Sequence, residues 1–175
     1  MMPWKAIAIG LCIAALASCA ASPDPNQAAP AFAPDRGQFT MPGGVGAFME
    51  RRCGALDCHG QIGRPLRIYS ANGLRKTDAT KPRSPRPIGP TTDDEKLDNY
   101  LSVIDLEPEA IGYSHATNGD YRDFMLLKKP LGLQNNGVRH KGGAVLREKS
   151  DPGYECLLSW IRGTVSTKDC TDATY

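Results

Sequence analysis

Two cysteines and a histidine lie within seven residues in the segment Cys53-Gly-Ala-Leu-Asp-Cys58-His59, and no other feature constrains the fold as strongly. In covalent haem attachment, two cysteine thioethers hold the porphyrin, and the histidine directly after the second cysteine ligates the iron. The common spacing has two residues between the cysteines, whereas this chain has four. We therefore predict a haem c site with His59 as the proximal iron ligand and a bulged loop between Cys53 and Cys58.

Three other interpretations of this segment stay open. Cys53 and Cys58 can form a small disulfide loop in an exported protein. A zinc knuckle fits less well, because structural zinc sites use a second compact ligand pair and this stretch offers none. A redox-active dithiol is the third interpretation, although the βαβ context that accompanies such motifs is missing. The rest of the chain favours haem.

The first 18 residues are predicted to be an export signal. Lys5 provides a positive start, and residues 6–17 form an uncharged apolar run that is too short to span a bilayer. The segment ends in Leu16-Ala17-Ser18-Cys19, which resembles the bacterial lipobox, so we expect Cys19 to carry a lipid anchor. An ordinary signal with a chance cysteine is the alternative. Ala20 favours the outer membrane of a bacterial envelope, with the protein facing the periplasm.

Residues 19–43 are predicted to be a flexible linker that leads to a folded domain at 44–175. The linker is rich in alanine and contains five prolines that prevent a continuous helix or strand, namely Pro23, Pro25, Pro30, Pro34 and Pro42. An irregular arm packed on the domain is the alternative. The chain has 41% hydrophobic and 23% charged residues, as one globular domain has, and its 21 basic and 19 acidic side chains give no indication of nucleic-acid binding.

Apolar periodicity and helix signals predict four helices. They are expected at Val45 to Cys53, at Thr92 to Ile104 with a capping box formed by Thr92 and Glu95, at Asp120 to Lys129, and at Asp151 to Gly163. Gly60 to Tyr69 is expected to be extended and to wrap a ligand. Ile111 to Asn118 is expected to be a polar loop that exposes His115.

A second histidine segment, His140-Lys141-Gly142-Gly143, lies in a predicted loop shortly before the last helix. The two glycines have no side chains to obstruct a close approach, so His140 can reach the far side of a haem. We predict His140 as the distal iron ligand, preferred over Met125, whose helical position favours core packing. A surface turn is the alternative for His140.

Several residues are candidates to support the haem. Arg64, Arg67 and Arg75 can neutralise its propionates, although arginines in a loop are often simply solvated. A backbone carbonyl near Pro65 can accept a hydrogen bond from the second ring nitrogen of His59 and so fix its tautomer.

Cys156 and Cys170 are predicted to form a disulfide. Cys156 lies on the last predicted helix and Cys170 in the tail beyond it. An oxidising compartment permits a bond that folds the tail back on the helix.

A helix enters the cysteine–histidine segment and is followed by a middle helix, a ligand loop and a last helix, which reads Leu157-Leu158-Ser-Trp160-Ile161-Arg-Gly163. This order of elements resembles class I cytochrome c domains over residues 44–165. The resemblance implies an all-α fold with long loops around the haem. It also implies a six-coordinate iron that carries electrons and catalyses no reaction, in a monomer that serves redox partner proteins at the membrane. The family usually has a distal methionine where this chain has His140, and methionine ligation raises the potential.

Two other functions remain as alternatives. A haem-free envelope lipoprotein, stabilised by disulfides, would have a binding or structural role. A five-coordinate haem enzyme or gas binder requires that His140 does not reach the iron.

Overall fold

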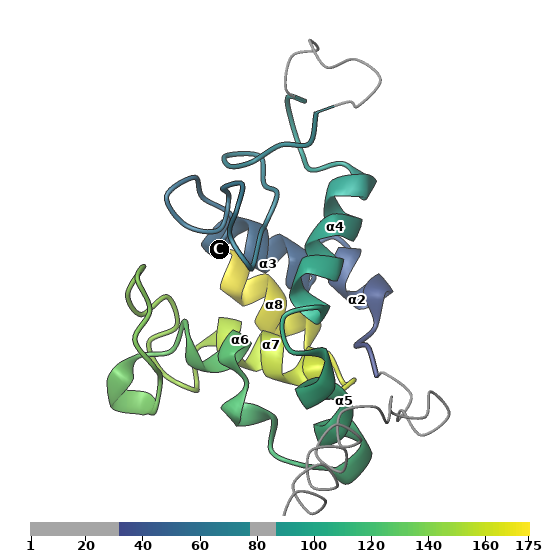
Figure 1. Ribbon diagram of the computed structural model, residues 1–175. Coiled ribbons are helices and arrows are strands. Elements are labelled where there is room, and N and C mark those ends of the chain that lie inside the picture. Colours follow the sequence, from purple (N-terminus) through teal and green to yellow (C-terminus); the bar gives the residue numbers. More distant parts are fainter. Residues whose placement is uncertain (1–31, 78–86) are drawn as a thin grey trace, which may run out of the picture. The chain divides into compact units, whose positions relative to one another are not determined.

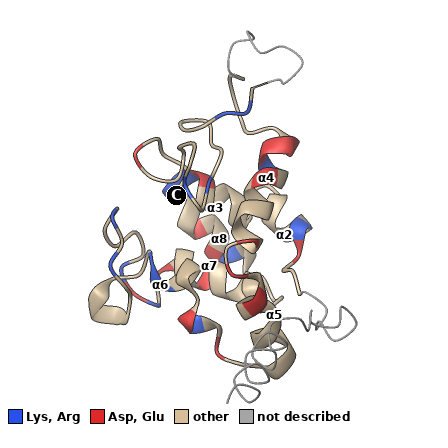
Figure 2. Ribbon diagram, viewed as in Figure 1, with Lys and Arg blue, Asp and Glu red and all other residues tan. Residues whose placement is uncertain are grey.

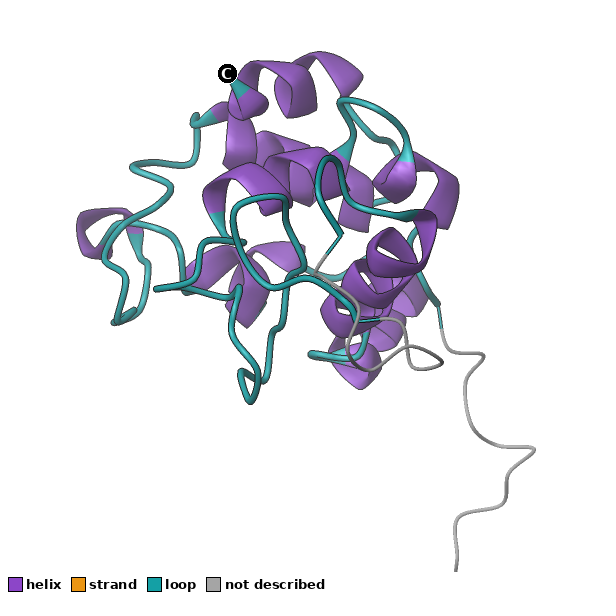
Figure 3. Cartoon of the chain, turned by 90° about the horizontal axis from the view of Figure 1, so that it is seen from above, coloured by secondary structure: helices purple, strands orange, loops and turns teal. Residues whose placement is uncertain are grey.

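The computed structural model describes residues 32–77 and 87–175, and this part of the chain is helical (Figure 1). Its helices are α2 (Arg36–Thr40), α3 (Val45–Arg52), α4 (Asp93–Ile104), α5 (Pro108–Thr117), α6 (Met125–Lys128), α7 (Pro152–Ile161) and α8 (Thr167–Thr174), with 3₁₀ turns η2 (Tyr121–Asp123) and η3 (Leu133–Asn135). Long loops connect them, and β-structure in the described residues is limited to isolated bridges (Figure 3). The predicted all-α class is confirmed. The predicted signal peptide, Cys19 and the linker up to residue 31 lie outside the described residues.

The core forms where α3 meets α7. Phe48 on α3 is almost fully buried, and Gly153 in the first turn of α7 lies directly against it. A Cβ atom at residue 153 would come within 2.7 Å of the Phe48 ring, so this close crossing requires glycine. Trp160 on α7 completes the core with no exposed surface.

The folded unit begins earlier than residue 44. Phe39 on α2 is 1% exposed and packs edge-on against Tyr100 and at a tilt against Trp160. The Tyr100 hydroxyl donates a hydrogen bond of 2.9 Å to the Pro34 carbonyl, and Trp160 Nε1 donates one of 2.9 Å to the Asp35 carbonyl. The expected linker boundary at residue 43 is therefore too late, because one phenylalanine among the prolines is enough to anchor an arm on the core.

A buried ion pair supports the start of α4, where the predicted capping box of Thr92 and Glu95 is present. Glu95 has no exposed surface and accepts two hydrogen bonds of 2.9 Å from the Arg75 guanidinium. The backbone N–H groups of Lys76 and Thr92 also donate to its carboxylate. Burial alone would raise the pKa of Glu95, but these hydrogen bonds hold it below its usual value. Arg75 is thus committed to Glu95 and does not serve a propionate.

The expected polar loop at Ile111 to Asn118 is wrong, because α5 occupies most of it. Pro108 stands in the first turn of this helix, where its missing N–H costs nothing, whereas α4 has already ended at Ile104. Asn118 ends the helix with φ at 52°, a left-handed conformation that asparagine tolerates. His115 is exposed, as expected, and its ring stacks on Phe32.

The helix expected from Asp120 to Lys129 is also wrong as a continuous element. Phe124 has an extended backbone and separates η2 from the short α6. The Asp120 side chain caps η2 by accepting a hydrogen bond from the Arg122 N–H, and Glu107 accepts one from the Met125 N–H at the start of α6. Two separate caps thus divide a segment whose apolar spacing resembles one helix.

The C-terminal tail forms a further helix, α8, which packs against α7 and α3 (Figure 1). Cys156 and Cys170 form the predicted disulfide between α7 and α8, with their Cα atoms 4.7 Å apart. None of the described helices is long and apolar enough to cross a membrane.

Candidate functional site

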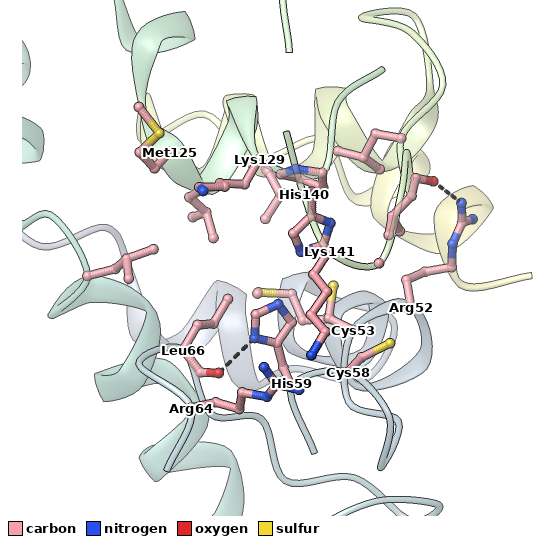
Figure 4. A pocket seen from close by; sticks show the side chains of 18 of the residues that line it. Arg52, Cys53, Cys58, His59, Arg64, Leu66, Met125, Lys129, His140 and Lys141 are labelled. Atoms are coloured by element: carbon pink, nitrogen blue, oxygen red, sulfur yellow. Dashed lines mark hydrogen bonds between the residues drawn. The ribbon is translucent and has the colours of Figure 1, made fainter. Parts of the chain in front are cut away.

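A cavity of about 550 Å³ opens beside the cysteine–histidine segment (Figure 4). Its wall is mainly apolar and is built by α3, α6, α7 and the loops around residues 57–66 and 140–146. The apolar lining consists of Phe48, Met49, Pro65, Leu66, Leu106, Met125, Leu126, Pro130, Val145, Leu146 and Leu157. Both the volume and the lining are those of sites that bind an organic cofactor.

Four residues between the two cysteines are accommodated in a compact turn. Cys53 caps α3 and its carbonyl accepts a hydrogen bond of 3.0 Å from the His59 N–H, while the Cys58 N–H donates to the Ala55 carbonyl. Gly60 follows, and a Cβ atom there would lie 2.3 Å from the Gly54 carbonyl oxygen. The turn therefore requires glycine and brings Cys53, Cys58 and His59 to one wall of the cavity.

The thiols of Cys53 and Cys58 are unpaired, so the disulfide loop that was the alternative for these two residues is not formed. Burial raises the pKa of Cys53 to about 12, and the pKa of Cys58 is raised by burial and by the neighbouring Asp57 carboxylate. Reactive redox thiols have lowered pKa values instead. The pair therefore lacks the electrostatics of a dithiol oxidoreductase.

The ring of His59 is fixed by a backbone carbonyl, as the sequence predicted, and the acceptor is the Leu66 oxygen beside Pro65. The distance from Nδ1 to this oxygen is 2.8 Å. Because a carbonyl only accepts, Nδ1 carries the proton and Nε2 keeps its lone pair. Burial lowers the pKa of His59, the Leu66 bond opposes this, and His140 and Arg64 lower it further. The neutral imidazole is therefore favoured, which is the form that ligates a metal.

His140 lies across the cavity and is held in the same way. Its Nδ1 is 3.0 Å from the Gly143 carbonyl, and the Gly143 N–H donates back to the His140 carbonyl at 3.0 Å. Gly143 has φ at +77°, which explains a glycine at this position of the turn. In the neutral ring of His140, this bond places the proton on Nδ1 and leaves the lone pair on Nε2.

The two imidazole rings lie close together (Figure 4), with their centroids 5.9 Å apart and their planes 11° from parallel. Two imidazoles that bind one metal ion through bonds of about 2 Å have their centroids roughly 6 Å apart. The distance between the His59 and His140 rings is therefore compatible with one shared ion. A porphyrin supplies its own four nitrogens, so two axial histidines complete an iron site.

The other predicted site residues divide into two groups. Arg64 lines the cavity, and its Nε–H is buried with no hydrogen-bond acceptor among the described residues, so an anionic group of a ligand would satisfy it. Met125 also lines the cavity, but it is 38% exposed at the first turn of α6. Arg67 lines a separate depression beside Arg64, and its guanidinium lies 5.4 Å from the centroid of the Tyr69 ring.

Three cations of the cavity were missed from the sequence, namely Arg52, Lys129 and Lys141. Arg52 and Lys141 directly adjoin Cys53 and His140, and this adjacency was the available signal. No feature of the sequence around Lys129 indicates that it lines a cavity, because its position there follows from how α6 packs.

Within the described residues, no three His, Cys, Asp or Glu side chains come together as a site for a bare metal ion. Comparisons with protein-family models, with curated proteins and with solved structures gave no match. The functional interpretation therefore rests on the geometry of this chain.

Proposed function

We propose that the cavity holds one covalently attached haem and that the protein is an electron carrier. Cys53 and Cys58 would form the two thioether bonds, and His59 and His140 would be the axial ligands. The observation that carries the proposal is the pair of nearly parallel imidazoles 5.9 Å apart, each with Nδ1 bound to a backbone carbonyl.

The surroundings support a haem rather than a bare ion. The apolar wall of the cavity suits a flat macrocycle, whereas two histidines alone fill only half of a tetrahedral zinc site. The buried Nε–H of Arg64 would donate to a propionate. Arg67 is the weaker propionate candidate because it does not line this cavity.

A haem supplies one-electron chemistry when bound. With His59 and His140 as ligands, no coordination position remains for a substrate, so the chain's part is to hold the ligands, exclude water with its apolar wall and set the redox potential. We propose His140 rather than Met125 as the distal ligand, because the His140 ring faces His59. This choice places the potential below that of a methionine-ligated centre.

We further propose that lipidation of Cys19 anchors the protein in the bacterial envelope, where it faces the periplasm, with the outer membrane favoured. The anchor would keep a monomeric carrier at high local concentration near membrane-bound redox partners. The sequence of residues 1–19 supports this part of the proposal. Labelling with a radioactive fatty acid tests it, and a Cys19→Ala variant that still incorporates label would contradict it.

Production with a cytochrome maturation system tests the haem. We expect haem staining of the denatured protein band and sharp reduced α and β absorption bands. The pyridine haemochrome spectrum should be that of a haem whose vinyl groups are both saturated. In the variant Cys53→Ala/Cys58→Ala the covalent haem should be lost, whereas Cys156→Ala/Cys170→Ala removes two other cysteines and should retain it. A colourless wild-type protein would contradict the proposal and favour the haem-free lipoprotein.

A further inference from the structure

Two cationic side chains reach across the cavity to the loop that carries His140. We define the distal loop as residues 139–145. An Nη of Arg52 donates a hydrogen bond of 2.8 Å to the Val145 carbonyl, at the end of the loop. Lys129 Nζ lies 3.5 Å from the Arg139 carbonyl, at its start. Figure 4 shows the Arg52 bond, which joins residues that are 93 positions apart in the sequence.

Both ends of the distal loop are fixed by backbone hydrogen bonds, from the Val138 N–H to the Lys128 carbonyl and from the Leu146 N–H to the Pro130 carbonyl, but the loop between them has few contacts. Its other hydrogen bonds to described residues are the two within its own turn, between His140 and Gly143. Residues 141–144 are exposed, and two of them are glycines. The turn thus fixes the ring of His140 relative to its own loop, while the bonds from Arg52 and Lys129 fix the loop relative to the cavity.

The hydrogen bonds that Arg52 and Lys129 make to the distal loop differ in strength. A separation of 3.5 Å is at the long limit of a hydrogen bond, whereas 2.8 Å from a guanidinium to a carbonyl is a short, charge-assisted bond. Arg52 is also the last residue of α3 and directly precedes Cys53. Arg52 therefore connects the end of α3, which leads into Cys53, with the distal loop that carries His140. Figure 2 shows this basic end of α3 and the basic residues of the loop that follows α6.

We infer that Arg52 is a positioning residue that keeps His140 over the cavity. The inference rests on the proposed function, since it assigns to Arg52 the control of how tightly the distal ligand is held. Without this bond the distal loop opens more often, and His140 leaves its place opposite His59. A small external ligand then gains access to that side.

Carbon monoxide binding to the reduced protein measures this access, because it requires His140 to move away. In Arg52→Met we expect binding about five- to tenfold faster than in the wild type, as the loss of one such hydrogen bond implies. Arg51→Met is the matched control, since Arg51 is an exposed neighbour on α3 whose side chain donates no hydrogen bond to described residues. Equal rates in Arg52→Met and Arg51→Met would overturn the inference.

A second substitution separates position from charge. Burial dominates the pKa of Cys53, but the Arg52 charge lowers it, so Arg52→Met can also slow haem attachment. Arg52→Lys keeps the charge beside Cys53 and loses the planar donor pair. Carbon monoxide binding in Arg52→Lys should lie between wild type and Arg52→Met. Because a lysine ammonium can also donate to the Val145 carbonyl, a rate in Arg52→Lys equal to that in Arg52→Met would show that a cationic donor at residue 52 does not hold the loop, and would overturn the inference.

Hydrogen exchange of the haem-free protein gives a readout that needs no cofactor. The hydrogen-bonded amides of Gly143 and Leu146 should exchange several-fold faster in Arg52→Met, while those of α7 stay unchanged. Unchanged exchange in the loop would overturn the inference. If the wild-type chain takes up no haem, the proposed function fails, and exchange alone still decides whether Arg52 holds the loop.

Discussion

The two histidines of the cavity have similar rings and very different supports. His59 belongs to a segment whose backbone bonds to Cys53 and Ile68 and whose ring bonds to Leu66. His140 belongs to a loop that is closed on itself, fixed at its two ends by the backbone of Val138 and Leu146, and bonded by the Arg52 side chain at Val145. One histidine is therefore part of the folded framework, and the other lies on a loop between two fixed ends.

This difference indicates which ligand exchanges. Opening the His59 side requires backbone hydrogen bonds of His59 itself to break, whereas His140 can move while the backbone bonds of Val138 and Leu146 at the loop ends stay intact. A c-type centre of this kind would keep its cofactor permanently while the strength of its distal ligation stays adjustable. The substitutions below test this asymmetry.

Replacing the histidines one at a time should give the largest effect. His59→Ala removes the ligand beside the attachment cysteines, and we expect loss of the sharp reduced spectrum together with most of the covalent haem. His140→Ala should retain the haem and bind carbon monoxide at least about tenfold faster. His115→Ala is the control, because His115 is exposed and stacks on Phe32 outside the cavity. Similar spectra for all three variants would contradict the assignment of both ligands.

The buried pair of Arg75 and Glu95 should give the next largest effect, because it fixes the chain that follows the His59 segment. Glu95→Ala leaves Arg75, only 6% exposed, without its carboxylate. We expect the free energy of unfolding to fall by about 3–5 kcal/mol, as when one partner of a buried pair is removed. Urea unfolding measures this change. Lys96→Ala, which breaks an ion pair with the fully exposed Asp93 on the same helix, should cost less than about 1 kcal/mol. Equal losses in both variants would show that burial of the pair is unimportant.

The disulfide between α7 and α8 should contribute somewhat less. Cys156 and Cys170 are 14 residues apart, and closing a loop of this length stabilises a protein by about 3 kcal/mol. Cys156→Ala/Cys170→Ala should therefore unfold at lower urea concentration and still retain covalent haem. Carbon monoxide binding should stay near the wild-type rate, since neither cysteine lines the cavity. A faster rate would mean that α8 also controls the distal loop.

Features that neighbouring residues encode could be predicted from the sequence, whereas features that depend on distant contacts could not. The attachment segment and the capping box of Thr92 and Glu95 are encoded by neighbouring residues, so their local geometry was predictable. The short, polar α8 was not, because helices of this length depend on tertiary contacts and here on the disulfide of Cys170. The bond from Arg52 to Val145 has no local signal at all, since it exists only after the chain has folded.

Errors in the predicted elements also have local causes. The segment after residue 104 was expected to lack a helix, although Pro108 is well placed to begin one. Phe124 continues the apolar spacing of a helix, yet its extended backbone divides the segment. Phe39 was placed in the linker because prolines surround it, and its burial against Tyr100 became visible only in the fold.

The smallest expected effect is a shift in the pKa of His59. Burial lowers this pKa first, and the nearby His140 lowers it further. In haem-free His140→Gln the second contribution disappears, so the pKa of His59 should rise toward its ordinary value near 6.5. Titration of the His59 ring by NMR measures this directly.

The same lowered pKa predicts how stability depends on pH. Because the folded protein resists protonation of His59, the unfolded chain binds that proton first as the pH falls below about 6.5. Stability of the haem-free protein should therefore decrease on acidification from this pH until the folded-state pKa of His59 is passed. In His59→Gln this part of the pH dependence should vanish. An unchanged decrease in His59→Gln would mean that His59 is not desolvated by the cavity, and that the fixed ligand is held less closely than its hydrogen bonds indicate.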